Sequence, residues 1–254
     1  MSGYRNCIVR AEFRNGVAID SAFTLDGLLG ALVIRSPEQR QRMRFRRNYV
    51  RMCRRYGEER AKEIFAERGW EIPRSVHMLP LAVWGHGLKS GLWVYASSYA
   101  FPDDPWEYDM VYWARRENTE QIVRWVDEGN LPKHLQLGKG PYRSYYMPLP
   151  VIVAPALTWY VRGDPEEIER LLREAPYIGK KRSQGHGRVS RWIVEEDDQD
   201  RSVWDGDRLM RPIPAELLEL MGIEGEFEYG YYAYRPPYHD PHNFTRCAMS
   251  GVRK

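Results

Sequence analysis

Apolar and polar side chains alternate weakly along residues 7–13, and this period of two predicts a half-buried strand. Thr24 is placed as the N-cap of an apolar helix over residues 25–34, whose small residues allow close packing on a sheet. A second apolar run, residues 151–161, predicts another strand. Asp164 and Glu167 then follow the D-x-x-E pattern of a helix start. Each of these two strands is therefore followed by a helix.

The pattern is less regular elsewhere, and turn residues mark most boundaries. Further strands are predicted at residues 79–84, 92–99, 111–114, 189–194 and 227–234, and short helices at residues 117–129 and 215–221. Residues 79–84 and 92–99 are joined by a glycine-rich connection, so we expect a hairpin there. The F-P-D-D-P-W run at residues 101–106 predicts a loop, and the proline-rich tail from residue 235 onward is expected to be irregular.

Residues 36–72 form a basic helical segment that begins with Ser36, Pro37 and Gln39 in capping-box order. Its arginines form one stripe on a helical wheel: Arg40, Arg44, Arg47, Arg51 and Arg55. Between residues 35 and 55 the only acidic residue is Glu38. Because a solvated helix face usually mixes charge signs, the unmixed stripe favours phosphate contact over an ordinary surface face.

Residues 178–189 read I-G-K-K-R-S-Q-G-H-G-R-V, in which three glycines and a run of cations separate a predicted helix from a predicted strand. The glycines, Gly179, Gly185 and Gly187, allow positive φ and are expected to leave backbone N–H groups uncovered. The cations that could follow a phosphate backbone are Lys180, Lys181, Arg182 and Arg188. The loop therefore suits a polyanion, while a solvated basic turn is the open alternative.

A second glycine-basic-aromatic segment at residues 137–150 places Lys139 and Arg143 beside Tyr145. This composition matches a surface for single-stranded nucleic acid, in which cations follow the backbone and aromatic rings stack on bases. A tyrosine-rich strand with an edge lysine fits the same residues.

With 254 residues, 43% of them hydrophobic, the chain can bury a core, and we expect a single domain over residues 1–254 that contains the insertion at 36–72. No secretory segment and no bilayer-length apolar run is evident, so we expect a soluble, cytoplasmic protein without membrane contact. Cys7, Cys53 and Cys247 are odd in number and widely spaced, so we expect reduced thiols.

The order of elements, taken without insertions, approximates the split βαβ unit of ferredoxin-like folds. Five motifs carry a closer resemblance: L-D-G-L-L at 25–29, K-G-P-Y-R-S-Y at 139–145, G-K-K-R-S-Q-G-H-G-R-V at 179–189, M-R-P-I-P at 210–214 and Y-R-P-P-Y at 234–238. With them the chain resembles the RAMP superfamily of CRISPR proteins, and most of all the Cas-five-like subunits of type IV systems. The resemblance implies an α+β, ferredoxin-like (RRM-like) fold with a basic helical insertion and extended loops.

The resemblance also implies a function, as a subunit of an RNA-guided DNA-targeting complex. Such a subunit holds the 5′ handle of the guide RNA, lies near the target DNA, and contacts backbone Cas-seven-like and large subunits. Carried over to this sequence, the guide RNA contacts are Gly179, Lys180, Lys181, Arg182, Gln184, Gly185, His186 and Arg188, with Lys139, Arg143 and Tyr145 nearby. The family does not fix the role of the arginine stripe, for which we hypothesise contact with target DNA or with the RNA handle.

A catalytic alternative must be considered, because related RAMP proteins cut guide precursors with a histidine or tyrosine general base. His186, with His86 and Tyr145 or Tyr146, could serve a metal-independent endoribonuclease in this way. Cleavage in type IV systems is generally assigned to a separate subunit, so we expect a non-catalytic RNA-binding protein. The H-D-P-H run at residues 239–242 lacks a second ligand pair of zinc-site spacing, and we expect neither a metal nor a cofactor.

Overall fold

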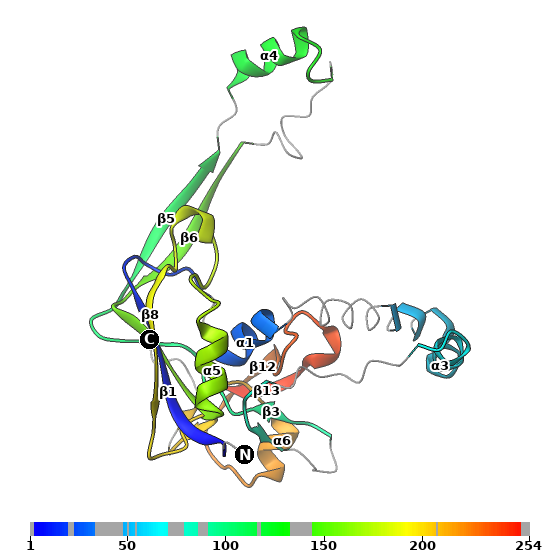
Figure 1. Ribbon diagram of the computed structural model, residues 1–254, viewed down its shortest axis with the longest axis vertical. Coiled ribbons are helices and arrows are strands. Elements are labelled where there is room, and N and C mark those ends of the chain that lie inside the picture. The colour runs from blue at the N-terminus through cyan, green and yellow to red at the C-terminus, as the bar shows by residue number, and fades with distance from the viewer. Residues whose placement is uncertain are drawn as a thin grey trace.

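The chain folds into a mixed α+β structure with antiparallel sheets, as predicted, and its elements are drawn in Figure 1. The computed structural model describes residues 3–19, 23–33, 48–49, 51–53, 55–70, 79–85, 91–115, 118–132, 144–206 and 208–249. None of the helices in these ranges combines the length and the apolar character needed to cross a membrane.

The largest sheet has four antiparallel strands. In spatial order they are β4 (Phe101–Pro102), β7 (Ala156–Gly163), β1 (Arg5–Phe13) and β8 (Val189–Glu196). Val9 of β1 pairs with Trp159 on one side and with Val194 on the other, so β1 lies in the interior of the sheet. Alternate residues of β1, Cys7, Val9 and Ala11, are fully buried. This confirms the strand that the alternation predicted.

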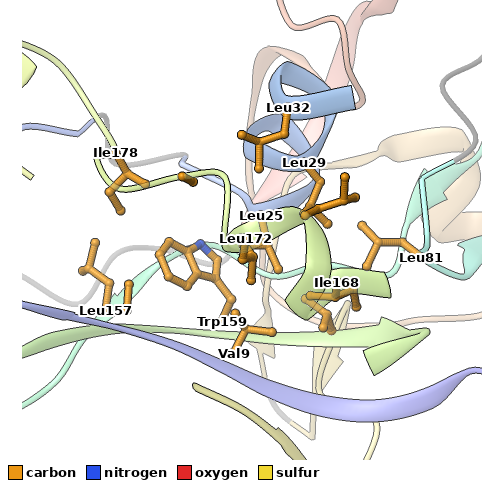
Figure 2. Close-up of a cluster of buried hydrophobic side chains, with 14 of the residues drawn as sticks. Val9, Leu25, Leu29, Leu32, Leu81, Leu157, Trp159, Ile168, Leu172 and Ile178 are labelled. Carbon is orange, nitrogen blue, oxygen red and sulfur yellow. The ribbon is translucent and has the colours of Figure 1, made fainter. Parts of the chain in front are cut away.

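Two helices, α1 (Leu25–Val33) and α5 (Pro165–Leu172), pack against each other and contribute to the core above this sheet. Trp159 lies at the centre of that core, where its Nε1 donates a hydrogen bond to the Phe23 carbonyl at 3.2 Å (Figure 2). Asp164 caps α5 by accepting from the Glu167 N–H at 3.2 Å, as the D-x-x-E pattern predicted. The cap fixes where β7 ends and α5 begins.

A second hydrophobic cluster surrounds helix α6 (Ala215–Leu220). Its three-stranded antiparallel sheet has the order β11 (Ile213–Pro214), β13 (Phe244–Met249) and β12 (Glu228–Ala233). Two short pairs add residues to the cluster: β2 (Val83–Trp84) with β3 (Val94–Tyr95), and β9 (Trp204–Asp205) with β10 (Arg208–Leu209). The β2–β3 pair confirms the predicted hairpin, with strands shorter than expected.

A long two-stranded ribbon projects from the main sheet (Figure 1), and we call it the arm. It consists of β5 (Glu107–Arg115) and β6 (Tyr145–Val153), with helix α4 (Thr119–Asp127) at its far end. β5 is longer than the strand predicted at residues 111–114. The described part of the second aromatic segment, residues 144–150, lies mainly in β6.

Three local predictions are wrong. Residues 101–106 are not all loop, because Phe101–Pro102 forms an edge strand on β7, a place where a missing proline N–H is tolerated. Residues 151–161 are not one strand, since β6 and β7 separate around Pro155. The tail is not all irregular, because β13 gains partners on both sides, β11 and β12. These pairings join residues far apart in the chain, which local patterns do not encode.

Three of the motifs that carried the family resemblance meet in one buried polar cluster. Arg211 Nη2 lies 3.2 Å from Asp26 Oδ2, and both side chains have no exposed area. The Tyr238 hydroxyl donates to Asp26 at 2.8 Å, and Arg211 also donates to the Tyr234 carbonyl at 2.7 Å. Burial disfavours charge on Arg211, but Asp26, Tyr238 and Tyr99 together outweigh it, so the pKa of Arg211 is raised. These motifs are therefore structural, joining α1 to the second cluster.

All three cysteines carry free thiols, as predicted. Burial raises the pKa of Cys7 to about 11 and that of Cys247 to about 12. Both thiols are therefore neutral and unreactive at physiological pH.

Candidate nucleic-acid interface

The glycine-rich loop, residues 178–189, connects α5 to β8 and is closed at its base by backbone hydrogen bonds. The Ile178 N–H donates to the Gly187 carbonyl at 2.9 Å, and the Val189 N–H donates to the Pro176 carbonyl at 3.0 Å. At the tip, the short helix η2 (Arg182–Gln184) makes one tight turn. The loop therefore has a defined shape set by its own backbone.

The loop is also hydrogen-bonded to residues 15–18, which follow β1. The Lys180 N–H donates to the Ala18 carbonyl at 2.7 Å, and the Gly187 N–H donates to the Gly16 carbonyl at 3.0 Å. The Asn15 side-chain amide donates to the Gly185 carbonyl at 3.3 Å. This contact could not be predicted from the sequence, because residues 15–18, N-G-V-A, contain no charged or aromatic side chain.

The glycines are needed for this close approach. A Cβ at Gly179 would lie 2.4 Å from the Ala18 carbonyl oxygen, and one at Gly187 would lie 2.0 Å from the Ile178 carbonyl oxygen. Both residues also have positive φ. The expectation of uncovered N–H groups is wrong for Gly185, which donates to the Arg182 carbonyl, and for Gly187. Both donors already have acceptors, the Arg182 carbonyl for Gly185 and the Gly16 carbonyl for Gly187, so the attraction of the loop for an anion rests on side-chain charge.

Most of the polar side chains of the loop are accessible to solvent. Lys180, Arg182 and Arg188 are exposed, as is Gln184, while His186 is half-buried. Within the described residues, neither Arg182 nor Arg188 forms an ion pair. Arginines on the preceding helix differ, since Arg170 pairs with Glu167 at 2.7 Å and Arg173 with Glu169 at 2.8 Å. Among the described residues, Arg182 and Arg188 thus carry positive charge without an ion pair, whereas the arginines of the neighbouring helix are paired.

Lys181 behaves differently from its neighbours and links the loop to the arm. Its Nζ lies 3.4 Å from the centroid of the Trp113 ring on β5. Trp113 in turn stacks on Tyr145 of β6, with centroids 6.3 Å apart and planes 8° from parallel. Tyr145 is thus linked to the loop through Trp113. Trp113 was missed, since one tryptophan in a short predicted strand carries no sign of a cation partner.

Most of the remaining predicted site residues cannot be placed relative to the loop. Lys139, Arg143, Arg40, Arg44 and Arg47 lie outside the described residues, as does His86. Arg51 and Arg55 are exposed, in a helical stretch whose Tyr49 ring contacts Phe65 of α3 (Glu58–Glu67) at 5.1 Å. Figure 1 shows α3 far from the arm and from β8. The described part of the arginine stripe is therefore a separate surface.

Potential metal ligands do not cluster in the described part of the chain. No three His, Cys, Asp or Glu side chains among the described residues lie close enough to share an ion. The geometry of the loop thus offers charge and aromatic faces for a ligand, both of which suit a nucleic acid.

Together these features define a mixed α+β protein that presents a basic, glycine-built loop at the base of an aromatic arm. Residues 76–250 match the family described as CRISPR type IV associated protein Csf3. The chain belongs to this family, which confirms the resemblance drawn from its motifs.

Two further comparisons were made. No curated protein matches the chain. Among solved structures, a chain of the cryo-EM structure of the type III-B Cmr-beta bound to cognate target RNA is similar, with a TM-score of 0.35 and 9% identity. The match covers 76% of this chain and 61% of that one, so less than two thirds of the solved chain is represented here.

Proposed function

We propose that this protein is a non-catalytic subunit of a type IV RNA-guided effector complex, in which the loop at residues 178–189 binds and caps the 5′ handle of the guide RNA. The observation that carries this proposal is the pair of loop arginines. Arg182 and Arg188 are exposed without an ion pair among the described residues, on a backbone closed by hydrogen bonds and close glycine packing. Cations placed in this way suit the phosphates of a single strand.

The fold supports the same proposal. The chain order β1, α1, β4, β7, α5, β8 and the spatial order β4-β7-β1-β8 agree with a ferredoxin-like split βαβ unit, counting β4 and β7 as its hairpin. We propose that the main sheet is such a unit and that the second cluster and the arm are additions to it. In this arrangement the loop occupies the connection between the second helix and the last strand.

We further propose partners that follow from family membership. The guide RNA is bound at the loop, and target DNA lies beside the complex that also contains backbone Cas-seven-like and large subunits. The arginine stripe, of which Arg51 and Arg55 are described, is proposed to contact target DNA or the RNA handle. Its distance from the loop in Figure 1 suits a second, independent nucleic-acid contact.

The experiment that tests loop binding measures RNA affinity against salt concentration. Each phosphate contact to a single strand adds about 0.7 to the slope of log affinity against log salt. We expect Arg182→Gln and Arg188→Gln each to lower this slope by about that amount. Arg173→Gln is the matched control, because Arg173 is equally exposed but paired with Glu169. Equal slopes for the wild type and both loop variants would contradict the proposal.

The absence of catalysis is also a proposal and has its own test. Purified protein is incubated with labelled CRISPR repeat RNA in EDTA, and we expect binding with the RNA left intact. A single site-specific cut that disappears in His186→Ala would overturn the non-catalytic assignment in favour of a metal-independent endoribonuclease.

A further inference from the structure

Lys181 has an unusual conformation for a loop cation. Its backbone is left-handed, with φ of 56°, the one positive φ of a non-glycine residue among those described. Side chains with a Cβ adopt this region at a cost. Lys181 is also half-buried, whereas the cations on either side of it, Lys180 and Arg182, are exposed. The contact of its Nζ with Trp113 at 3.4 Å is a favourable interaction that offsets this cost.

The arm has a second attachment at its base. Val17 and Ile152 exchange two backbone hydrogen bonds of 2.8 Å, so β6 is tied to the segment that follows β1. Ile152 pairs with Tyr108, and Trp113 lies five residues farther along β5. At the rise of an extended strand, the two attachments are about 17 Å apart.

The same short segment holds both the arm and the loop. Val17 binds β6, while its neighbours Gly16 and Ala18 accept hydrogen bonds from the loop. A two-stranded ribbon fixed at one point can pivot about that point. A second contact farther out, between Lys181 and Trp113, fixes the angle between the arm and the loop.

We propose that Lys181 is a positioning residue, which sets the arm against the loop through Trp113 and does not bind phosphate. Through the stacking of Trp113 on Tyr145, Lys181 is linked to the Tyr145 ring at the start of β6. A single bound RNA strand could then stack a base on Tyr145 while one of its phosphates contacts Arg182. This inference rests on the proposed RNA-binding function of the loop.

The first test needs no RNA and measures the position of the arm. Spin labels are placed on the arm (Ala114→Cys) and on α5 (Glu169→Cys) in a Cys53→Ser background, since both positions are exposed and the other cysteines are buried. Pulsed electron-paramagnetic-resonance then gives the distribution of label–label distances. We expect Lys181→Gln and Trp113→Leu to broaden it. Lys181→Arg, which keeps a cation over the ring, and the control Lys180→Gln are expected to leave it unchanged.

The second test measures RNA affinity against salt in the same variants. Lys181→Gln and Trp113→Leu are expected to weaken binding about fivefold with an unchanged salt slope, because these variants lose a cation–π contact but no phosphate contact. Lys181→Arg should restore wild-type affinity. A lower slope in Lys181→Gln, or a distance distribution that Lys181→Gln leaves unchanged, would overturn the positioning role.

The two tests separate this inference from the proposed function. If the wild-type protein shows no salt-dependent RNA binding, the proposed function fails. The distance measurement, made without RNA, still decides whether Lys181 fixes the arm.

Discussion

Gly185 and Gly187 lie two residues apart in one loop, and both have positive φ. Their surroundings differ, because a Cβ at Gly185 meets nothing nearer than the Asn15 side chain at 3.9 Å, while one at Gly187 lies 2.0 Å from the Ile178 carbonyl oxygen. Gly187 is also buried, and its N–H is bonded to Gly16. At the scale of single residues, the loop therefore depends on Gly187 for packing and on Gly185 only for backbone conformation.

This difference predicts unequal effects of the same substitution. Gly185→Ala is expected to lower the free energy of unfolding by about 1 kcal/mol, the cost of a left-handed backbone for alanine. Gly187→Ala adds a clash with the Ile178 carbonyl oxygen, so it is expected to lower the free energy of unfolding by clearly more than Gly185→Ala. Urea unfolding of the two variants makes the comparison, and equal losses would mean that residues 178 and 187 separate easily.

Two helices with similar N-caps have different places in the molecule. Asp164 caps α5, whose residues Ile168 and Leu172 are fully buried in the main core. Asn118 caps α4 by accepting from the Glu120 and Gln121 N–H groups, but α4 lies at the end of the arm (Figure 1) and buries only Ile122. At the scale of elements, the first cap supports the cooperative core and the second supports a local structure.

Removal of the two caps is therefore expected to affect different parts of the molecule, the whole core for Asp164 and only α4 for Asn118. Asp164→Ala is expected to lower the free energy of global unfolding by about 1 kcal/mol, a usual cost for a lost N-cap. Asn118→Ala should leave global unfolding nearly unchanged and speed hydrogen exchange within α4 alone. Hydrogen exchange read by mass spectrometry distinguishes the two, and a global loss from Asn118→Ala would show that the arm folds together with the core.

At the scale of the whole molecule, the ion pair of Asp26 and Arg211 joins two hydrophobic clusters. Asp26 belongs to α1 above the main sheet, and Arg211 precedes β11 of the second cluster. Both are fully buried, and Tyr238 from a third segment completes the network. Burial, with Asp26 nearby, raises the pKa of Tyr238, so its hydroxyl stays protonated and able to donate.

Loss of Arg211 leaves the Asp26 carboxylate buried without its cation. Arg211→Leu is therefore expected to lower the free energy of unfolding by about 3–5 kcal/mol. The double variant Arg211→Leu with Asp26→Leu should recover part of that loss, because no charge remains buried. Urea unfolding of the single and double variants tests this, and equal stability of Arg211→Leu and the wild type would show that the pair does not hold the clusters together.

The sequence by itself determined the features that depend on neighbours in the chain. The alternation in β1 and the Asp164 cap of α5 are local, and the five motifs together led to the right family. The glycines and cations of residues 178–189 marked a loop at the correct junction. These features follow from side-chain periodicity and capping chemistry, which a short stretch of chain carries within itself.

Only the tertiary structure decided which of these residues meet. It gave the motif residues Asp26, Arg211 and Tyr238 a shared structural role, and it formed β13 from part of the tail. It also divided the loop cations, since Lys181 lies on Trp113 while Arg182 remains exposed. Buried ion pairs, strand pairing and cation–π contacts join residues tens to hundreds of positions apart, and no local pattern records that distance.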